Sequence, residues 1–214
     1  MFRNLKASFL PAAVLFSSFA CGLAAQELKP VPLPKPQMTG GKPLMEALSQ
    51  RQTTRAFREA PLPPQTLSNL LWAAFGVNRP DSVKKGTGRT APSAMNRQEV
   101  QLYVVLPQGA YLYDALANQL QPVATGDLRA EVGGDAAAHA AVTIVYAADV
   151  KFDFAQVDVG FIGQNVYLFA ASEGLNAWFY ALHGPQDTAT VAAALKLPGN
   201  LHPLYKQSVG FPPQ

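Results

Sequence analysis

Two arginines lie four positions apart in the polar stretch Arg51-Gln52-Thr53-Thr54-Arg55. A guanidinium group presents a planar fork of N–H donors that suits phosphate and carboxylate groups. The amide and hydroxyl side chains between the arginines can donate hydrogen bonds to the same kind of ligand. By itself such a pair is typical of a solvated surface. It therefore indicates an anion site only in combination with other segments.

Three further segments stand out for their order and spacing. Arg89–Gln98 contains a run of small residues that would let the backbone approach a flat ligand closely. Asp158–Leu175 is a long apolar stretch, typical of a core helix. The last segment joins Leu195–Gly199 to Val209–Pro212. Each is weak alone, and the shared order of all four carries the interpretation.

Other kinds of site are disfavoured. Gly86-Thr-Gly88 fits a relaxed dinucleotide motif, but Lys85 precedes it and Pro92 follows, where a strand and a helix are needed. Cys21 is the single cysteine, and the three histidines lack metal-ligand spacing. The net charge of +3, part of it from Arg3 and Lys6 near the N-terminus, does not favour nucleic acid.

The four segments together resemble the nitroreductase family. Trp72–Gly76 and the run Arg89–Ser93 resemble its SagB-type dehydrogenase branch in particular. The resemblance covers about residues 44–212 and implies an α+β fold, a homodimer and FMN bound between the subunits. In such an enzyme the flavin itself carries the chemistry, so no catalytic side chain is assigned.

The resemblance also implies roles for individual residues. Arg51 matches the arginine that binds the FMN phosphate, Gln52 and Thr53 match the polar pair beside it, and Arg55 faces the pyrimidine edge of the ring. The second subunit would contribute a loop, and a turn would place backbone N–H groups near the hydride-carrying nitrogen. The loop comprises Pro92, Ser93, Ala94 and Asn96, and the turn comprises Ala181, Leu182, His183 and Gly184.

Two departures from the family pattern bear on FMN affinity. The family commonly has a basic phosphate ligand after its Gly-Phe-Pro strand, and Gly210-Phe-Pro212 is followed here by no basic residue. This contact is either absent or supplied by Lys84, Lys85 or Arg89. In addition, Gln52 stands where arginine is more frequent.

The residue patterns predict an α+β domain with a mixed or antiparallel central sheet, flanking helices and one long buried central helix. Residues 78–92 read as a loop, and residues 111–113 and 120–123 as a small hairpin. The predicted helices are 42–50, 64–75, 154–172 and 188–195, and the predicted main strands are 100–106, 141–147, 177–182 and 205–211.

The N-terminal region reads as a signal peptide at residues 1–25, a proline-rich linker at 26–41 and the domain at 42–214. Residues 7–25 form an apolar run that ends in small residues; the alternative is an uncleaved membrane anchor. Cys21 is either a lipid-attachment site or part of a discarded leader. Alternating prolines favour an extended spacer in the linker.

These features lead us to expect an exported, periplasmic FMN-dependent oxidoreductase that is not inserted in the membrane once its leader is removed. Its partners would be a second copy of the chain, a small organic substrate and an electron donor. Nicotinamide donors are scarce outside the cytoplasm, which favours another carrier, a quinone or an oxidised substrate. The alternatives are an NAD(P)H-dependent nitro or quinone reductase and a non-catalytic flavin-binding protein.

Overall fold

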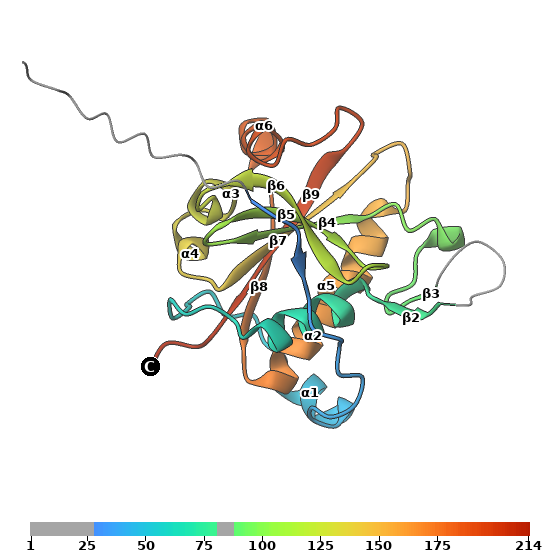
Figure 1. The fold of residues 1–214 in the computed structure, drawn as a ribbon, viewed down its shortest axis with the longest axis vertical. Coiled ribbons are helices and arrows are strands. Elements are labelled where there is room, and N and C mark those ends of the chain that lie inside the picture. Colours follow the sequence, from blue (N-terminus) through green and yellow to red (C-terminus); the bar gives the residue numbers. More distant parts are fainter. Residues whose placement is uncertain (1–27, 81–87) are drawn as a thin grey trace, which may run out of the picture.

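The computed structural model describes residues 28–80 and 88–214 and contains a seven-stranded sheet in the order β1-β6-β5-β4-β7-β9-β8 (Figure 1). Neighbouring strands in this sheet all pair antiparallel. A separate small hairpin pairs β2 (Val77–Arg79) with β3 (Gly88–Arg89). The sheet strands are β1 (Val31–Pro32), β4 (Gln101–Leu106), β5 (Gly109–Asp114), β6 (Gln119–Thr125), β7 (Val142–Ala148), β8 (Asn176–Ala181) and β9 (His202–Gly210).

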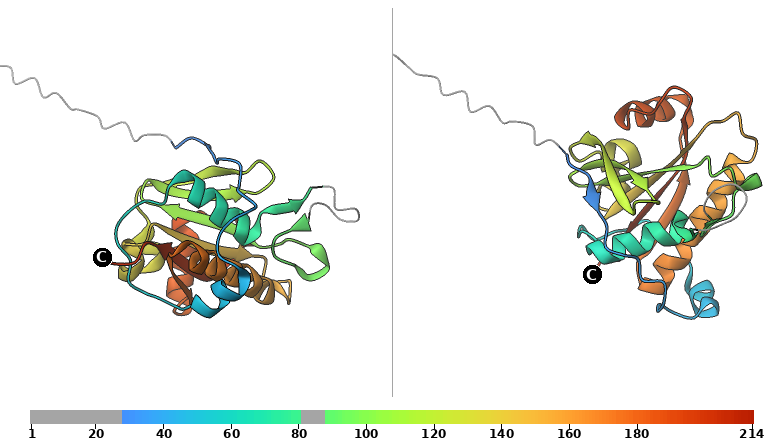
Figure 2. Two further views of the ribbon diagram at one scale, coloured as in Figure 1. Left: turned by 90° about the horizontal axis from the view of Figure 1, so that it is seen from below. Right: turned by 45° about the vertical axis from the view of Figure 1, so that its right-hand side comes forward.

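Helices cover both faces of this sheet (Figures 1 and 2). On one side lie α2 (Pro64–Phe75) and α5 (Ala155–Glu173), and α1 (Leu44–Gln50) packs beside α5. On the other side lie α3 (Arg129–Gly133), α4 (Asp135–Ala138) and α6 (Gly184–Ala194). The expected α+β fold with an antiparallel central sheet flanked by helices is therefore confirmed.

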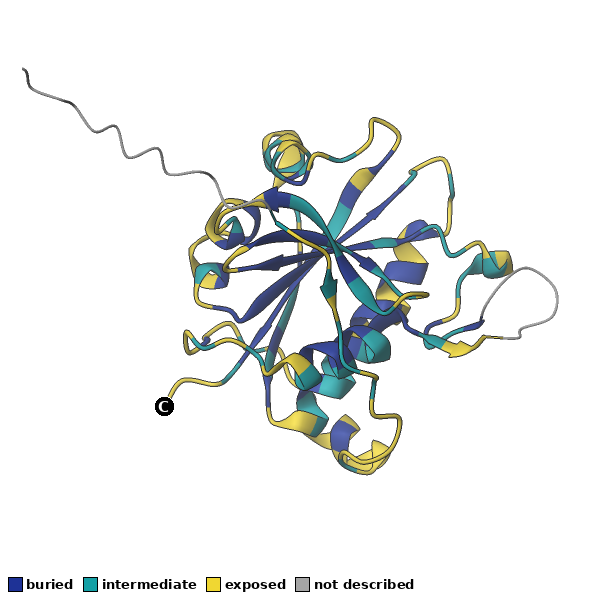
Figure 3. Ribbon diagram, in the orientation of Figure 1, coloured by how far each residue is buried: buried dark blue, intermediate teal, exposed yellow. Residues whose placement is uncertain are grey.

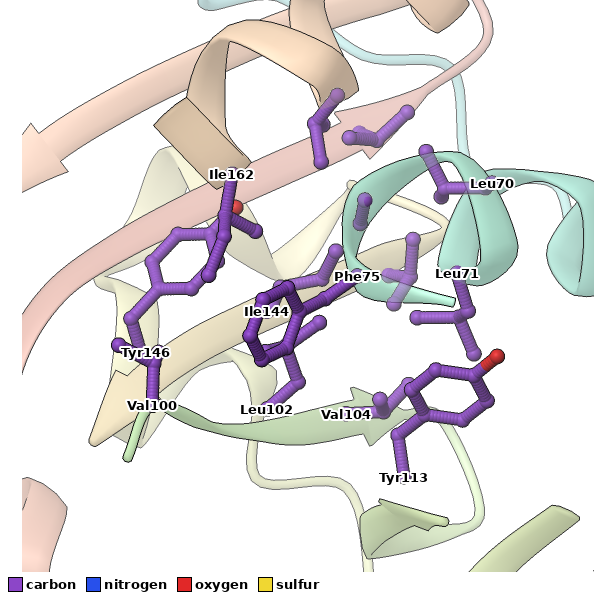
Figure 4. Close-up of a cluster of buried hydrophobic side chains, with 14 of the residues drawn as sticks. Leu70, Leu71, Phe75, Val100, Leu102, Val104, Tyr113, Ile144, Tyr146 and Ile162 are labelled. Carbon is purple, nitrogen blue, oxygen red and sulfur yellow. The ribbon is translucent and has the colours of Figure 1, made fainter. Parts of the chain in front are cut away.

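The central strands are buried on both faces because alternate side chains enter two separate cores. Leu102 and Val104 of β4 pack with Ile144 of β7 under α2 and α5 (Figure 4). Their neighbours Tyr103 and Val105 enter the core beneath α3 and α6. Side chains that alternate across a strand produce this division, which explains why these strands read as continuous apolar runs.

Most predicted elements are present, with shifted ends. The expected loop 78–92 contains the β2–β3 hairpin instead of being wholly irregular. The helix expected from Thr188 begins earlier, at Gly184, whose φ of 82° starts the turn from which the helix continues through Pro185. Proline fits the first helical turn because its missing N–H is not needed there, so the Gly-Pro pair opens this helix.

The proline-rich segment differs from the expected free spacer. Its described part lies along the domain, where Val31 pairs with Leu120 of β6. Asn118 donates its side-chain amide to the Pro34 carbonyl at 2.9 Å. Proline lacks an N–H, so the sheet edge is a place where it does not interrupt a hydrogen-bond ladder. The proposed signal peptide and Cys21 lie outside the described residues.

The long helix α5 is buried on the side that faces the sheet and α2, but not all round. Phe154, at its N-cap, and Val157 and Phe161 within it are among the exposed large apolar side chains. Leu44 and Met45 on α1 are also exposed (Figure 3). In the part of the chain that the structure describes, no helix is both long and apolar enough to span a membrane.

Candidate functional site

The segment that begins at Arg51 lies along β8, the edge strand of the sheet. Helix α1 ends at Gln50, and the Arg51 N–H donates to the Ala47 carbonyl at 2.9 Å. The chain then extends, and the Thr54 N–H donates to the Ala177 carbonyl at 2.9 Å. The Ala177 N–H donates back to the Thr54 hydroxyl at 3.1 Å. These two bonds fix the register of the polar segment against the sheet edge.

Aromatic side chains support both arginines of this segment. The Arg51 guanidinium lies 5.3 Å from the centre of the Tyr167 ring, and that of Arg55 lies 5.6 Å from Trp178. Within the described residues neither arginine forms an ion pair with a carboxylate. A cation stacked on a ring keeps its N–H edges available to an anion. The two guanidinium groups are thus suited to a negatively charged ligand.

Tyr167 of α5 connects this segment to the strand. Its hydroxyl lies 2.9 Å from the Thr53 hydroxyl and accepts the Phe179 N–H at 2.8 Å. Gln52, between Arg51 and Thr53, is exposed. A cavity of about 480 Å³ adjoins the group and is lined by Lys42, Ser49, Gln50, Arg51, Gln52, Tyr167, Ala170, Ala171, Gly174, Leu175 and Asn176.

The small-residue loop lies at the other end of α5. Ala94 starts the 3-10 turn η1 (Ala94–Asn96), and its N–H donates to the Asp158 carboxylate at 2.9 Å. The Ser93 hydroxyl accepts the Gln98 backbone N–H at 3.0 Å, and the Gln98 side-chain amide donates to the Asn96 side-chain oxygen Oδ1 at 2.9 Å. Pro92 is exposed at the start of the loop.

Arg89 does not serve as a free cation in this structure. Its Nε donates to the Gln98 side-chain oxygen Oε1 at 2.7 Å and its Nη1 donates to the Phe75 backbone carbonyl at 3.2 Å. Burial lowers the pKa of Arg89, although the charges of Tyr113 and Asp114 oppose the shift. Of the three candidates for a replacement phosphate ligand, Arg89 is therefore committed to holding the loop. Lys84 and Lys85 lie outside the described residues.

An ion pair between Lys206 and Asp187 stabilises the turn that follows β8. The His183 N–H donates to the Asp187 carboxylate at 2.8 Å, and the Lys206 ammonium lies 2.8 Å from the same oxygen. Burial alone would raise the pKa of Asp187, but Lys206 and the His183 N–H outweigh it and lower the pKa. In this conformation the His183 N–H is used within the protein.

The other residues of the turn have separate surroundings. Ala181 ends β8 and is exposed, whereas Leu182 packs against the core beneath α6. Gly184 has a φ of 82° and its carbonyl accepts the Thr188 hydroxyl at 3.0 Å. The Leu182 side chain therefore anchors the turn. The backbone of the turn is the part that remains available to contact a ligand.

The three expected groups lie at separate points of one chain. The Arg51 segment and the turn flank the two ends of β8, four residues apart, which is about 13 Å of strand. The loop instead contacts Asp158, nine residues before Tyr167 on α5, and that separation is about 13.5 Å along the helix. Ala94 thus contacts the first turn of α5, whereas Arg51 lies over Tyr167 in its later half.

Sequence reasoning missed the residues that support these groups. Tyr167, Trp178 and Lys206 lie in the predicted helix 154–172 and the predicted strands 177–182 and 205–211, and no local motif marks them. The one available signal was Asp158, an acidic residue near the start of a largely apolar helix. Among residues 28–80 and 88–214, no cluster of three or more metal-binding side chains occurs.

Comparison with known proteins shows which family has this architecture. Residues 48–211 match the family model described as "Nitroreductase family". A nitroreductase-like protein of Ralstonia eutropha of known structure is 33% identical, with a TM-score of 0.78 over 86% of this chain and 90% of that one.

Two more distant structures share the fold. An FMN-dependent nitroreductase of Clostridium difficile is 17% identical, with a TM-score of 0.59 over 79% of this chain and 88% of its own. A chain of the Escherichia coli microcin synthetase McbBCD complex is 21% identical, with a TM-score of 0.63 over 97% and 85%. With its family match over most of the domain, the chain belongs to the nitroreductase family of oxidoreductases.

Proposed function

We propose that this protein is an exported FMN-dependent oxidoreductase that transfers two electrons, as a hydride, to or from a small organic substrate. The observation that carries the proposal is the pair of arginines, Arg51 and Arg55, which lie on the edge of β8 without a carboxylate partner in the described chain. The relative from Clostridium difficile that is described as FMN-dependent supports the same cofactor.

The residues present fit FMN at its anionic end. Arg51 would bind the phosphate dianion with charge-assisted hydrogen bonds, and Gln52 and Thr53 would donate to phosphate or ribityl oxygens. Arg55 would place positive charge beside the pyrimidine edge of the ring. The bound flavin supplies the hydride chemistry, and the chain supplies orientation, charge and exclusion of water.

The turn after β8 requires one change in hydrogen bonding before its His183 N–H can contact a flavin. Because Asp187 accepts the His183 N–H, that donor could reach a flavin only if the bond were shared or exchanged. The backbone of Gly184 lies at the same turn and carries no side chain that would block a flat ring. Contact through Ala181, Leu182, His183 and Gly184 is thus proposed for their backbone atoms alone.

A homodimer would complete the site. Loop residues Pro92, Ser93, Ala94 and Asn96 adjoin the first turn of α5, away from Arg51. The family resemblance implies that this loop reaches the flavin of a second copy. Exposed Phe154, Val157 and Phe161 form an apolar strip on α5, because residues three and four apart share a helix face. A helix that leaves such a strip exposed is typical of an interface between subunits.

The electron donor follows from the expected export. We favour exchange with an exported carrier, a quinone or an oxidised substrate over NADH or NADPH. The likeness to the microcin synthetase complex and the motifs at Trp72–Gly76 and Arg89–Ser93 are compatible with a SagB-type dehydrogenase branch. A nicotinamide-driven nitro or quinone reductase is the alternative that family membership favours.

The test begins with reconstitution of the purified protein with FMN and with FAD, followed by desalting and absorbance spectra. Retention of FMN is expected, and loss of all flavin from folded protein would contradict the proposal. The loaded protein is then mixed anaerobically with NADH, NADPH or a reduced quinol while the flavin absorbance is followed. Rapid bleaching by micromolar nicotinamide would favour the alternative reductase, and no bleaching by any donor would favour a non-catalytic flavin-binding protein.

A further inference from the structure

The loop before β4 has an unusual backbone. Met95, Asn96 and Gln98 have φ angles of 53°, 53° and 54°, although none of them is glycine. A side chain with a Cβ is disfavoured in this left-handed region, and such residues persist only where their surroundings hold them. Three of them within four positions require a specific support.

Asp158 supplies one such support from the first turn of α5. Its side chain is almost fully buried, with 1% of the residue exposed, and its Oδ2 atom accepts the Ala94 N–H at 2.9 Å. Asp158 is the one charged side chain among the buried residues of α5, and packing alone does not explain a buried carboxylate there. The bond ties the start of the turn to a rigid element.

A second carboxyl group lies beside it. Glu99 directly follows the loop, and both of its carboxyl oxygens are shielded from solvent without a hydrogen-bond donor in the described part of the chain. Burial is the main cause that raises the pKa of Glu99, and Asp158 raises it further, whereas the backbone of Glu99 itself and the charge of Arg97 lower it. Asp158 on α5 and Arg97 on the loop itself are the charged groups that act on Glu99.

Two adjoining carboxyl groups with little access to water do not both ionise easily, and a shared proton relieves their repulsion. We propose that Asp158 and Glu99 form a carboxyl latch that holds the Ser93–Gln98 loop in the conformation it needs to contact the flavin. Asp158 would then be a positioning residue, because it acts on the flavin through Ala94 and the loop. This inference rests on the proposed function, in which the loop reaches FMN.

The latch depends on one proton. When Glu99 is protonated, its O–H donates to the Asp158 carboxylate, which still accepts the Ala94 N–H. When Glu99 releases the proton to solvent, two negative charges face each other and the hold on Ala94 weakens. Because its pKa is raised on folding, the stabilisation is present below the ordinary glutamate value and is lost as pH rises through the raised value. FMN affinity should fall over the same range.

The experiment measures FMN affinity by flavin fluorescence from pH of about 4 to about 9, with hydrogen exchange of the Ala94 amide in the flavin-free protein. Wild-type affinity should fall about tenfold over this range, the scale of one hydrogen bond to a charged group. Glu99→Gln, whose amide donates to Asp158 at every pH, should remove the pH dependence at full affinity. Glu131→Gln, on an exposed acid of α3, should behave as wild type.

Variants of Asp158 complete the test. Asp158→Ala should lower FMN affinity about tenfold at low pH and speed exchange at Ala94. Asp158→Asn, which keeps an acceptor for the Ala94 N–H and can donate to ionised Glu99, should rescue both. A wild-type pH profile in Glu99→Gln, or unchanged Ala94 exchange in Asp158→Ala, would overturn the latch. If the wild type binds no FMN at any pH, the proposed function fails, while exchange at Ala94 still reports on the latch itself.

Discussion

Beneath the turn after β8, the ion pair between Lys206 and Asp187 is asymmetric. The Lys206 side chain is 3% exposed, whereas that of Asp187 is 20% exposed. Asp187 also accepts the His183 N–H. The Lys206 ammonium also lies 5.3 Å from the centre of the Tyr180 ring. Removing one partner or the other should therefore have unequal effects on the free energy of unfolding.

The difference can be worked from these surroundings. Asp187→Ala leaves a buried ammonium group without a carboxylate, which should cost about 3–5 kcal/mol. Lys206→Met removes the buried charge and keeps the volume, and Asp187 retains the His183 N–H and some contact with water. That variant should cost about 1–3 kcal/mol. The double variant should be more stable than Asp187→Ala alone, because it no longer buries an unpaired charge.

Urea unfolding of the three variants and the wild type measures these costs. The pKa of Asp187 is lowered on folding, so the pair's contribution is present above about pH 4 and is lost as pH falls through the lowered pKa. The gap between wild type and Asp187→Ala should thus narrow in acid. A Lys206→Met variant as unstable as Asp187→Ala, or a gap that widens in acid, would refute the reasoning.

Three further predictions concern the cofactor, the assembly and the core. Arg51→Ala should weaken FMN binding at least about tenfold and leave riboflavin binding unchanged in fluorescence titrations. Arg58→Ala, on an arginine stacked on Phe211, is the matched control. Equal losses of FMN and riboflavin binding in Arg51→Ala would show that Arg51 has a structural role. Phe161→Arg should convert a dimer to a monomer in light scattering, and a flavin-loaded wild-type monomer would contradict the dimer. Gly163→Ala should lower the free energy of unfolding, measured in urea, by about 1–3 kcal/mol, because a Cβ would lie 2.7 Å from the Phe179 ring. An unchanged free energy of unfolding would show that the ring can move aside.

The sequence predicted the central strands because their apolar runs carry the local signal. Ile144 and Val145 enter opposite cores, so an uninterrupted apolar run is the pattern that this position requires. The strand at Val31–Pro32 was missed for the opposite reason. It is two residues long and contains a proline, and its partner Leu120 lies almost ninety positions away. Only the folded sheet edge makes it a strand.

Local sequence motifs identified the candidate binding residues, but not the residues that hold them in place. Arg51 and Thr53 stand in one short polar segment, which sequence comparison can recognise. The ring beneath Arg51 and the hydroxyl beside Thr53 both come from Tyr167, more than a hundred residues later. Asp187 meets Lys206 across a helix and a strand. Such contacts depend on packing between elements, so no spacing rule in the sequence predicts them.

The position of the loop connects assembly with function. Ala94 is bound to Asp158 near the start of α5, and Thr53 is bound to Tyr167 in its later half. Exposed Phe161 lies between these two points on the helix. A twofold axis near Phe161 would lay two copies of α5 side by side in opposite directions, which brings the loop of one chain toward Thr53 of the other. The same apolar contact that would stabilise the dimer would then assemble each flavin site, so loss of the dimer and loss of FMN should occur together.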